Sequence, residues 1–311
     1  MTGGAGFVGS HIVDALVHEG ARVKVVDNFT RGGGTNLADA QTGGNVELVT
    51  GDIREAALWD RILPGVDVVF HQAALRVNRC EESPQECWDV MVEATRHLFN
   101  ACAVQGVKKI VAASSAIVYG AADTLPTPET HHLNHNTTWY GAAKIMNEQL
   151  INIFRSSQKR SGAVLRYFNI YGPRMATQGH TEVLVKWFQA LDAGQPLRIF
   201  GDGTQTMDWV HVKDVAIANI LAAKTATEHG LFNIGTGTET SLRDLAIKVL
   251  RLWGRKDDPE LVRTQAPTNP IPRRWADITA GRRELGFKPR FSLEDGLADM
   301  IHWWKDNVRT V

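Results

Sequence analysis

Short apolar runs alternate with amphipathic stretches through the first two thirds of this 311-residue chain, and this alternation most constrains its fold. Each run is almost continuously apolar, which is typical of a parallel strand buried on both faces of a sheet. Strands and helices in this alternating order predict a doubly wound α/β sheet. The expected strands are 21–27, 46–52, 66–74, 108–115 and 163–169, and the expected helices between them are 9–19, 85–105 and 138–159.

A second, smaller unit is expected after Tyr171, where turn-rich and loop-rich segments replace the alternation. We predict one domain of residues 1–168 plus about 209–235, and a C-terminal α/β domain of residues 169–208 and 236–311. The proline-containing segment 255–274 is either a loop that covers a substrate or a connector. Further helices are expected near 181–193, 241–253 and 292–306.

The charge balance argues against broad nucleic-acid or membrane surfaces. The chain has 34 basic and 34 acidic residues and a formal net charge of zero, which disfavours a nucleic-acid partner or an anionic membrane. It has no apolar run long enough to span a bilayer and no signal-peptide pattern, so we expect a cytoplasmic protein. Cys80, Cys87 and Cys102 form neither a zinc pattern nor a disulfide framework, and we expect reduced thiols in or near the core.

The stretch "TGGAGFVGSH" contains a glycine turn, with Gly3, Gly6 and Gly9 leading into an amphipathic helix. Residues without a side chain let the backbone approach a pyrophosphate at a helix N-terminus. The next strand ends in Asp27, which can accept hydrogen bonds from ribose hydroxyls and would repel a 2′-phosphate. This pattern favours NAD over NADP, a preference that the nearby Arg31 could qualify. Alternatively, Asp27 only caps the turn before Asn28.

A second constellation is Tyr140 and Lys144 in "WYGAAK", which share one helical face because they are four residues apart. Tyrosine has an unperturbed pKa of about 10, and a nearby ammonium should lower it enough for Tyr140 to act as a base. Ser115 ends a predicted strand upstream and could relay the proton of a substrate hydroxyl. The alternative is an ordinary exposed helix pair.

These motifs resemble those of the extended short-chain dehydrogenase/reductases, in the NAD-dependent sugar-nucleotide epimerase and dehydratase group. The resemblance runs nearly end to end and implies a Rossmann-type NAD-binding domain followed by a smaller substrate-binding domain. It rests on "TGGAGFVGSH", "VVDN", "GDIR", "VFHQAA", "SSAIVYG", "YGAAK", "LRYFNIYGPR", "IFGDGTQ", "DWVHVKDVA", "FNIGTG" and "RRELGFKPRFSLEDGL".

The resemblance also implies a set of binding residues. Tyr140, Lys144 and Ser115 would be catalytic, and Lys144 would also hold the nicotinamide ribose. The NAD-binding residues would be Gly3, Gly6, Phe7, Val8, Gly9, Asp27, Asn28, Asp52, Ile53, Ala73, Ala74, Arg76, Tyr140, Lys144, Tyr167, Asn169 and Ile170, and the substrate-binding residues would be Ser115, Ala116, Asn169, Arg198 and Arg274.

The beginning of the chain departs from the pattern of the group. In relatives, a central strand ending in valine or a similar residue leads into the glycine turn, whereas here only Met1 and Thr2 precede it. We expect Met1 to occupy the final position of this strand, most of which is absent from the sequence. Either a GTG codon has been taken as the start and the true start lies upstream, or the chain is truncated and binds its cofactor less tightly.

The residues after Ser115 bear on the reaction. Dehydratases and some decarboxylases of this group carry an acidic residue there, but this chain has Ala116 and Ile117, which cannot transfer a proton. The resemblance therefore implies an NAD-dependent epimerase that inverts a sugar hydroxyl, commonly at C4, through a keto intermediate. The alternatives are a net dehydrogenase or reductase and a non-catalytic nucleotide-binding protein.

The substrate side also departs from the pattern. Epimerases of the group usually carry an arginine for the nucleotide pyrophosphate where this chain has Met207, and an "RPGD" motif where it has "PTNP" at 267–270. Arg198, Arg273 and Arg274 are the candidates to replace them, since guanidinium groups suit phosphates. Otherwise the substrate is an unusual nucleotide sugar, or a sugar or polyol without a nucleotide.

Three histidines, His131, His132 and His135, lie close together before Tyr140. We expect them to belong to a polar loop over the active site and expect no metal, because the inferred chemistry needs none. The resemblance further implies a homodimer that pairs through the helices at 85–105 and 138–159. Trp303 and Trp304 on the last predicted helix suit packing or subunit contact.

Overall fold

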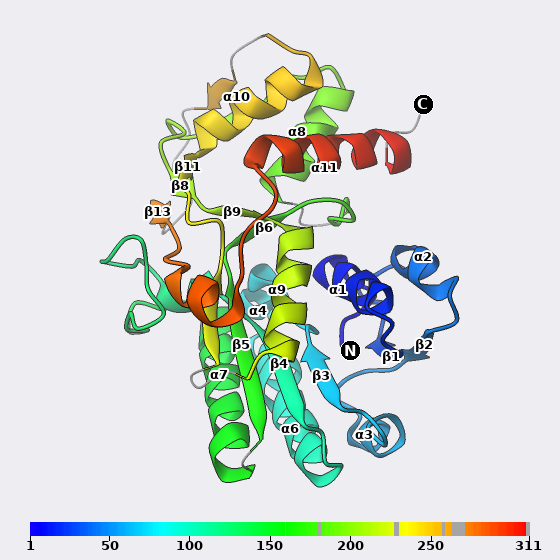
Figure 1. Cartoon of the computed structure of the whole chain (residues 1–311). Helices are drawn as coiled ribbons and strands as arrows, with labels where there is room; N and C mark the ends of the chain where they lie inside the picture. Colours follow the sequence, from blue (N-terminus) through cyan, green and yellow to red (C-terminus); the bar gives the residue numbers. More distant parts are fainter. Residues whose placement is uncertain (159, 179–181, 227–229, 257–258, 263–270, 309–311) are drawn as a thin grey trace.

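The computed structural model describes residues 1–158, 160–178, 182–226, 230–256, 259–262 and 271–308. The chain forms an N-terminal lobe around a parallel sheet and a C-terminal lobe of helices and short strands (Figure 1). The α/β class and the parallel sheet predicted from the sequence are therefore confirmed. The predicted domain limits themselves stay a prediction.

The strands of the N-terminal lobe run in the order β2-β1, then β3-β4-β5-β10, and all of their pairings are parallel. The two groups meet at Thr2, which forms parallel bridges to Val26 on one side and His71 on the other. Met1 and Thr2 thus lie where the sequence predicts the end of a central strand. The strands are β1 (Val23–Asp27), β2 (Val46–Thr50), β3 (Val68–His71), β4 (Lys109–Ser115), β5 (Ser161–Tyr167) and β10 (Leu231–Ile234).

Helices cover both faces of this sheet, which explains why its strands are apolar on both sides. In β4, Ile110 and Ala112 pack with α3, α6 and α7, whereas Val111 and Ala113 pack with α1 and α9. The helices are α1 (Phe7–His18), α3 (Ala56–Ile62), α6 (Ala94–Val104), α7 (Trp139–Gln158) and α9 (Val212–Lys224). A short 3-10 turn and helix, η1 (Gly34–Leu37) and α2 (Ala38–Gln41), lie between β1 and β2.

The helix predicted at 85–105 is less regular than expected. Its first turn is α5 (Pro84–Cys87), a π-helical stretch follows as η2 (Trp88–Glu93), and only then does α6 begin. Similarly, the predicted strand 163–169 divides, because β5 ends at Tyr167 and β6 (Asn169–Tyr171) pairs with β9 (Trp209–His211) outside the main sheet.

The expectation of three reduced thiols is wrong for two of them. Cys80 and Cys87 form a disulfide, whereas Cys102 is free and buried. The chain leaves helical geometry at Ser83, between α4 (Val77–Glu82) and α5, and this break brings the two Cα atoms within 4.8 Å. Such a separation suits a disulfide, and sequence spacing alone does not reveal it. The expected location in the core is correct, since all three side chains are buried.

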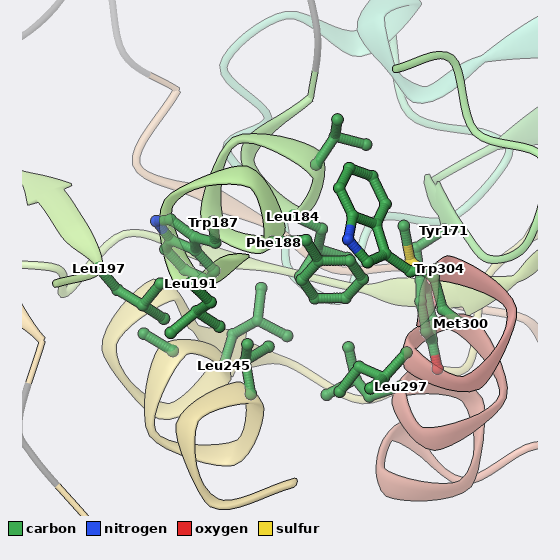
Figure 2. Close-up of a cluster of buried hydrophobic side chains, with 14 of the residues drawn as sticks. Tyr171, Leu184, Trp187, Phe188, Leu191, Leu197, Leu245, Leu297, Met300 and Trp304 are labelled. Carbon is green, nitrogen blue, oxygen red and sulfur yellow. The ribbon is translucent and has the colours of Figure 1, made fainter. Parts of the chain in front are cut away.

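The C-terminal lobe has its own hydrophobic core between α8 (Val183–Asp192), α10 (Leu242–Trp253) and α11 (Leu293–Asn307) (Figure 2). Trp304 is buried there, and its indole nitrogen donates to Asp192 Oδ2 at 2.6 Å, as expected for a packing residue. The smaller elements are β7 (Arg198–Phe200), β8 (Thr206–Met207), β9 (Trp209–His211), β11 (Thr240–Ser241), β12 (Glu260–Val262), β13 (Arg273–Arg274) and η4 (Gly281–Leu285).

Within the described ranges, none of the helices has the length and apolar character that a membrane crossing requires.

Candidate active site

The glycine turn lies at the carboxyl end of the sheet and leads into α1. Gly3 has φ +66°, and a Cβ added to it would lie 2.7 Å from the backbone nitrogen of Ala73. A Cβ on Gly9 would collide with the carbonyl oxygen of Gly3. Only glycine therefore fits these positions, and the first amides of α1, which have no partner within the helix, can bind an anion.

Asp27 ends β1 beside this turn. Its Oδ2 accepts a hydrogen bond from Ala5 N at 2.9 Å, and its Oδ1 accepts one from Phe29 N at 2.9 Å. The predicted turn-capping role is therefore present. Each carboxylate oxygen can accept more than one hydrogen bond, so the same geometry leaves capacity for ribose hydroxyls.

Asn28, Asp52 and Ile53 lie at the ends of the neighbouring strands. Asn28 Nδ2 donates to Asp52 Oδ2 at 3.1 Å. Arg54 donates to both carboxylate oxygens of Asp52, and these hydrogen bonds lower the pKa of Asp52 to about 2. Ile53 is buried. The predicted adenine-side residues are thus brought together, and Arg54 is a member of this group that the sequence reasoning missed.

The segment after β3 contains Ala73, Ala74 and Arg76. Ala73 N donates to the hydroxyl of Thr2 at 3.3 Å, which holds this segment against the glycine turn. Arg76 forms an ion pair with Glu182, with Nη2 and Oε1 3.0 Å apart. Glu182 immediately precedes α8 of the C-terminal lobe, so this ion pair joins the two lobes beside the glycine turn.

Ser115, Tyr140 and Lys144 come together where β4 ends against α7. Ser115 is the last residue of β4, and its hydroxyl accepts a hydrogen bond from Ile117 N at 3.2 Å. Tyr140 and Lys144 lie one helical turn apart, with Lys144 Nζ 5.7 Å from the centre of the tyrosine ring. Tyr140 and Ser115 also interact through their side chains. The structure therefore assembles all three predicted catalytic residues.

The pKa of Tyr140 shifts in the opposite direction from the sequence-based expectation. Burial raises the pKa of Tyr140 to about 12, and the hydrogen bond with Ser115 offsets only part of that effect. The ammonium of Lys144 donates to the carbonyl oxygen of Ala113 at 2.8 Å. Burial also lowers the pKa of Lys144 to about 8, although the carboxylate of Glu148 acts against this shift. Desolvation therefore dominates both groups.

Tyr167 and Asn169 lie where the two lobes meet. The hydroxyl of Tyr167 contacts Gln72 and Asn219, each within 3.2 Å. Asn169 Nδ2 lies 2.9 Å from the sulfur of Met207, and Ile170 is half-buried in the adjoining core. The predicted nicotinamide-side residues therefore lie next to the predicted substrate side.

Comparisons with known proteins agree with this geometry. Residues 1–235 match the NAD dependent epimerase/dehydratase family. The chain belongs to this family. It is 34% identical to the UDP-glucose 4-epimerase of Mycolicibacterium smegmatis, with 98% of each chain covered.

Solved structures of this family are similar over the whole chain. The UDP-glucose 4-epimerase of Thermotoga maritima with UDP-glucose gives a TM-score of 0.92 at 32% identity, covering 99% of this chain and 98% of that one. DesIV, a dTDP-glucose 4,6-dehydratase of Streptomyces venezuelae solved with NAD, gives a TM-score of 0.89 at 30% identity. The match covers 98% of this chain and 96% of that one. The expected Rossmann fold and the NAD cofactor are confirmed, and the chain is an NAD-dependent sugar epimerase. The glycine turn fits NAD because glycine at positions 3 and 9 allows the close backbone packing of this turn, in which a Cβ would collide with Ala73 or with the Gly3 carbonyl.

This epimerase also has a buried ion pair beneath its catalytic residues. Glu148 lies one further turn along α7 from Lys144 and accepts hydrogen bonds from Arg166 on β5, at 2.9 Å and 2.6 Å. Ser114 donates to the same carboxylate at 2.6 Å. The sequence reasoning missed Glu148, although its spacing of four residues from Lys144 was a usable signal.

Asp208 is a second residue that the sequence reasoning missed. It is fully buried, and its carboxylate accepts hydrogen bonds from the backbone amides of Thr236 and Gly237. A third, longer contact at 3.4 Å comes from the amide of Ala276. Asp208 therefore fixes the turn after β10 against the segment that carries β13.

The substrate-side arginines occupy different environments. Arg274 on β13 is the register partner of Met207 on β8, and its Nε is buried with no hydrogen-bond partner among the described residues. Arg273 is exposed and bonded to Glu239 at 2.6 Å. Arg198 is also exposed and pairs with Glu260 at 3.4 Å. The "PTNP" segment at 267–270 lies outside the described residues.

Proposed function

We propose that this epimerase inverts the C4 hydroxyl of a nucleotide sugar. The observation that carries the proposal is that Ser115, Tyr140 and Lys144 come together where β4 ends, in a chain that also has the glycine turn. Its relatives include enzymes named UDP-glucose 4-epimerase, so UDP-glucose and UDP-galactose are the first substrates to test.

In the proposed reaction, Tyr140 as phenolate accepts the proton of the C4 hydroxyl. NAD, when bound, supplies a reversible acceptor for the C4 hydride. Ser115 hydrogen-bonds the same hydroxyl and keeps it within reach of Tyr140. Because burial holds the pKa of Tyr140 near 12, the phenolate needs positive charge nearby, which the ammonium of Lys144 contributes. After the keto sugar turns over, Tyr140 would return the proton to its C4 oxygen as the hydride that NAD holds is given back, which completes the inversion.

The residues after Ser115 favour epimerisation over elimination. Ala116 is buried and Ile117 is aliphatic, so neither can protonate a departing hydroxyl. One relative, from Bacillus cytotoxicus, is named UDP-N-acetyl-alpha-D-glucosaminuronate decarboxylase and is 31% identical to this chain. Relatives of this chain therefore include enzymes named for reactions other than epimerisation. The alanine and isoleucine at these positions are the reason to prefer an epimerase here.

For the substrate diphosphate we propose Arg274. Position 207 carries methionine, and Arg274 lies directly across the β8–β13 pairing from it. Burial lowers the pKa of Arg274, and its Nε, which has no hydrogen-bond partner in the described part of the chain, is suited to an anionic ligand. Arg273 and Arg198 are weaker candidates because carboxylates already hold them.

The decisive experiment is to incubate the purified protein with UDP-glucose or UDP-galactose and to follow the C4 epimers by NMR. Interconversion without added reductant and without lasting NADH absorbance supports the epimerase. Stoichiometric NADH formation would instead identify the alternative function, a net dehydrogenase. This alternative is tested because position 207 carries methionine in place of the usual arginine.

We also propose that the enzyme is a homodimer that pairs through α7 and the helical segment 84–104. Trp139, Met146 and Ile153 are spaced seven residues apart on α7, and they are 53%, 39% and 58% exposed. An apolar stripe with this spacing is typical of helix pairing. Light scattering should give a dimer mass that falls to the monomer in Met146→Glu/Ile153→Glu. The cytoplasmic location stays a prediction.

A further inference from the structure

We propose that the loop before Tyr140 holds a divalent transition-metal ion of the Zn²⁺ type. Asp123, His132 and His135 lie on the segment between η3 (Ala116–Tyr119) and α7. One ligand atom from each residue can be chosen so that all three lie within 4.8 Å of one another. The site is separate from the proposed catalytic residues and does not depend on the proposed function.

The spacing of the ligand atoms suits a metal. His132 Nε2 and Asp123 Oδ2 lie 3.1 Å apart. Two ligands bound to zinc at about 2.0 Å in tetrahedral geometry are about 3.3 Å apart. An ion could therefore replace the proton between these atoms with little movement, and His135 lies beside them, with its ring centre 4.6 Å from that of His132.

Neighbouring groups orient two of the ligands in the way that metal sites require. His135 Nδ1 lies 2.8 Å from the carbonyl oxygen of Ala121. It can donate a hydrogen bond to this oxygen when Nδ1 carries the ring hydrogen. In the neutral ring, this hydrogen bond leaves Nε2 with a free lone pair. The buried His131 places Nε2 2.7 Å from Asp123 Oδ1, which holds the carboxylate with its second oxygen toward His132.

The donor set selects the class of metal. Two imidazoles and one carboxylate suit zinc and its neighbours, whereas Mg²⁺ and Ca²⁺ prefer oxygen ligands alone. Three protein ligands leave a fourth position for water, and all three residues are exposed. The sequence alone favoured a polar loop without metal, because the inferred chemistry needs none. It could not show that Asp123 joins the histidines.

The ion would brace a loop that both lobes share. Thr127 in this loop forms a bridge to Ala276, and Glu129 accepts a hydrogen bond from Asn233 N at 2.8 Å. The same loop connects Ser115 to Tyr140 along the chain. Metal binding should therefore raise the thermal unfolding temperature of the protein by mass action, without taking part in the reaction.

The test is calorimetric titration of Zn²⁺ into the full chain, free of any histidine tag and treated with chelator. The expected result is one equivalent of Zn²⁺ bound, with affinity at least roughly tenfold weaker in His132→Ala, His135→Ala and Asp123→Asn. Co²⁺ should give a visible absorption band that the same variants lose, and Mg²⁺ should not compete.

The matched control is His302→Ala. His302 is exposed and lies 3.3 Å from Asp306, so it forms a histidine–carboxylate pair that is not part of the three-residue cluster. This variant should bind Zn²⁺ like the parent protein. The proposal is overturned if the parent binds no Zn²⁺, or if the loop variants bind it as well as His302→Ala does. Unchanged circular dichroism and NAD content in each variant exclude misfolding as the cause of lost binding.

Discussion

The two sides of the active site are constructed differently. On the NAD side, strands of one parallel sheet position the glycine turn, Asp27 and Ser115, because the carboxyl ends of these strands lie at one edge of the sheet. On the substrate side, Arg274 reaches Met207 only through a two-residue strand pairing across a long stretch of sequence. Local motifs therefore describe the first side well, whereas the second depends on contacts that tertiary structure creates.

The largest expected effect concerns the NAD side. Tyr140→Phe keeps the ring but removes the hydroxyl, so turnover should fall by about 10²–10⁴-fold, the usual contribution of general acid–base catalysis. Bound NAD, measured by its release on denaturation, should remain. Normal turnover in this variant would remove Tyr140 from the mechanism.

The second prediction tests whether the glycine turn is as inflexible as its geometry indicates. Gly9→Ala should destabilise the protein by about 1–3 kcal/mol and reduce its bound NAD, because the new Cβ collides with the Gly3 carbonyl. Gly43→Ala is the control, since a Cβ there meets nothing within 4 Å. Equal unfolding free energies and NAD contents in the two variants would contradict the steric argument.

The third prediction concerns the substrate side. Arg274→Ser should raise KM for a nucleotide sugar by about 10–100-fold with little change in kcat, since a charged hydrogen bond is worth about 1.5–3 kcal/mol. The double variant Met207→Arg/Arg274→Ser should lower KM again toward the value of the parent protein, because it places a positive charge at the register partner of residue 274.

The control for this prediction is Arg273→Ala, which removes an exposed arginine bonded to Glu239 and should leave KM unchanged. Epimerase activity with an unaltered KM in Arg274→Ser would reject Arg274 as the diphosphate ligand while leaving the proposed reaction intact.

The fourth prediction is a pH dependence of stability that arises in the sheet lobe. Burial lowers the pKa of His71 to about 3 and that of His11 to about 4, from an ordinary 6.5. Below about pH 6.5 the unfolded chain therefore binds protons that the folded chain does not. The contribution of these two histidines to the free energy of unfolding should be fully present above this pH. It should decline as the pH falls toward 4 and then 3.

Denaturant midpoints measured from pH 7.5 down to pH 4 will test this expectation. His71→Asn should show a shallower decline than the parent protein, although it is less stable at pH 7.5 because it alters contacts with Thr2 and Thr95. A variant as steep as the parent would mean that His71 is not a source of the acid sensitivity.

The contrast between local motifs and tertiary contacts also explains which features the sequence could predict and which required the structure. The parallel strands follow from short continuous apolar runs, and the Tyr140–Lys144 pair follows from a spacing of four residues on a predicted helix. Both signals are local in the chain. The Cys80–Cys87 disulfide does not, because it depends on a break in helical geometry at Ser83. The pKa of Tyr140 could not be predicted either, since the sequence shows the neighbouring lysine but not the burial that outweighs it.

By itself, the amino-acid sequence determined the parallel α/β fold, the glycine turn for NAD and the residues that carry the proposed chemistry. It could do so because hydrophobic periodicity and glycine geometry act over a few residues. Only the tertiary structure decided that Arg274 faces Met207, that Glu148 and Arg166 form a buried pair under Lys144, and that Asp123 joins two histidines. These arrangements join distant segments, and packing alone brings them together.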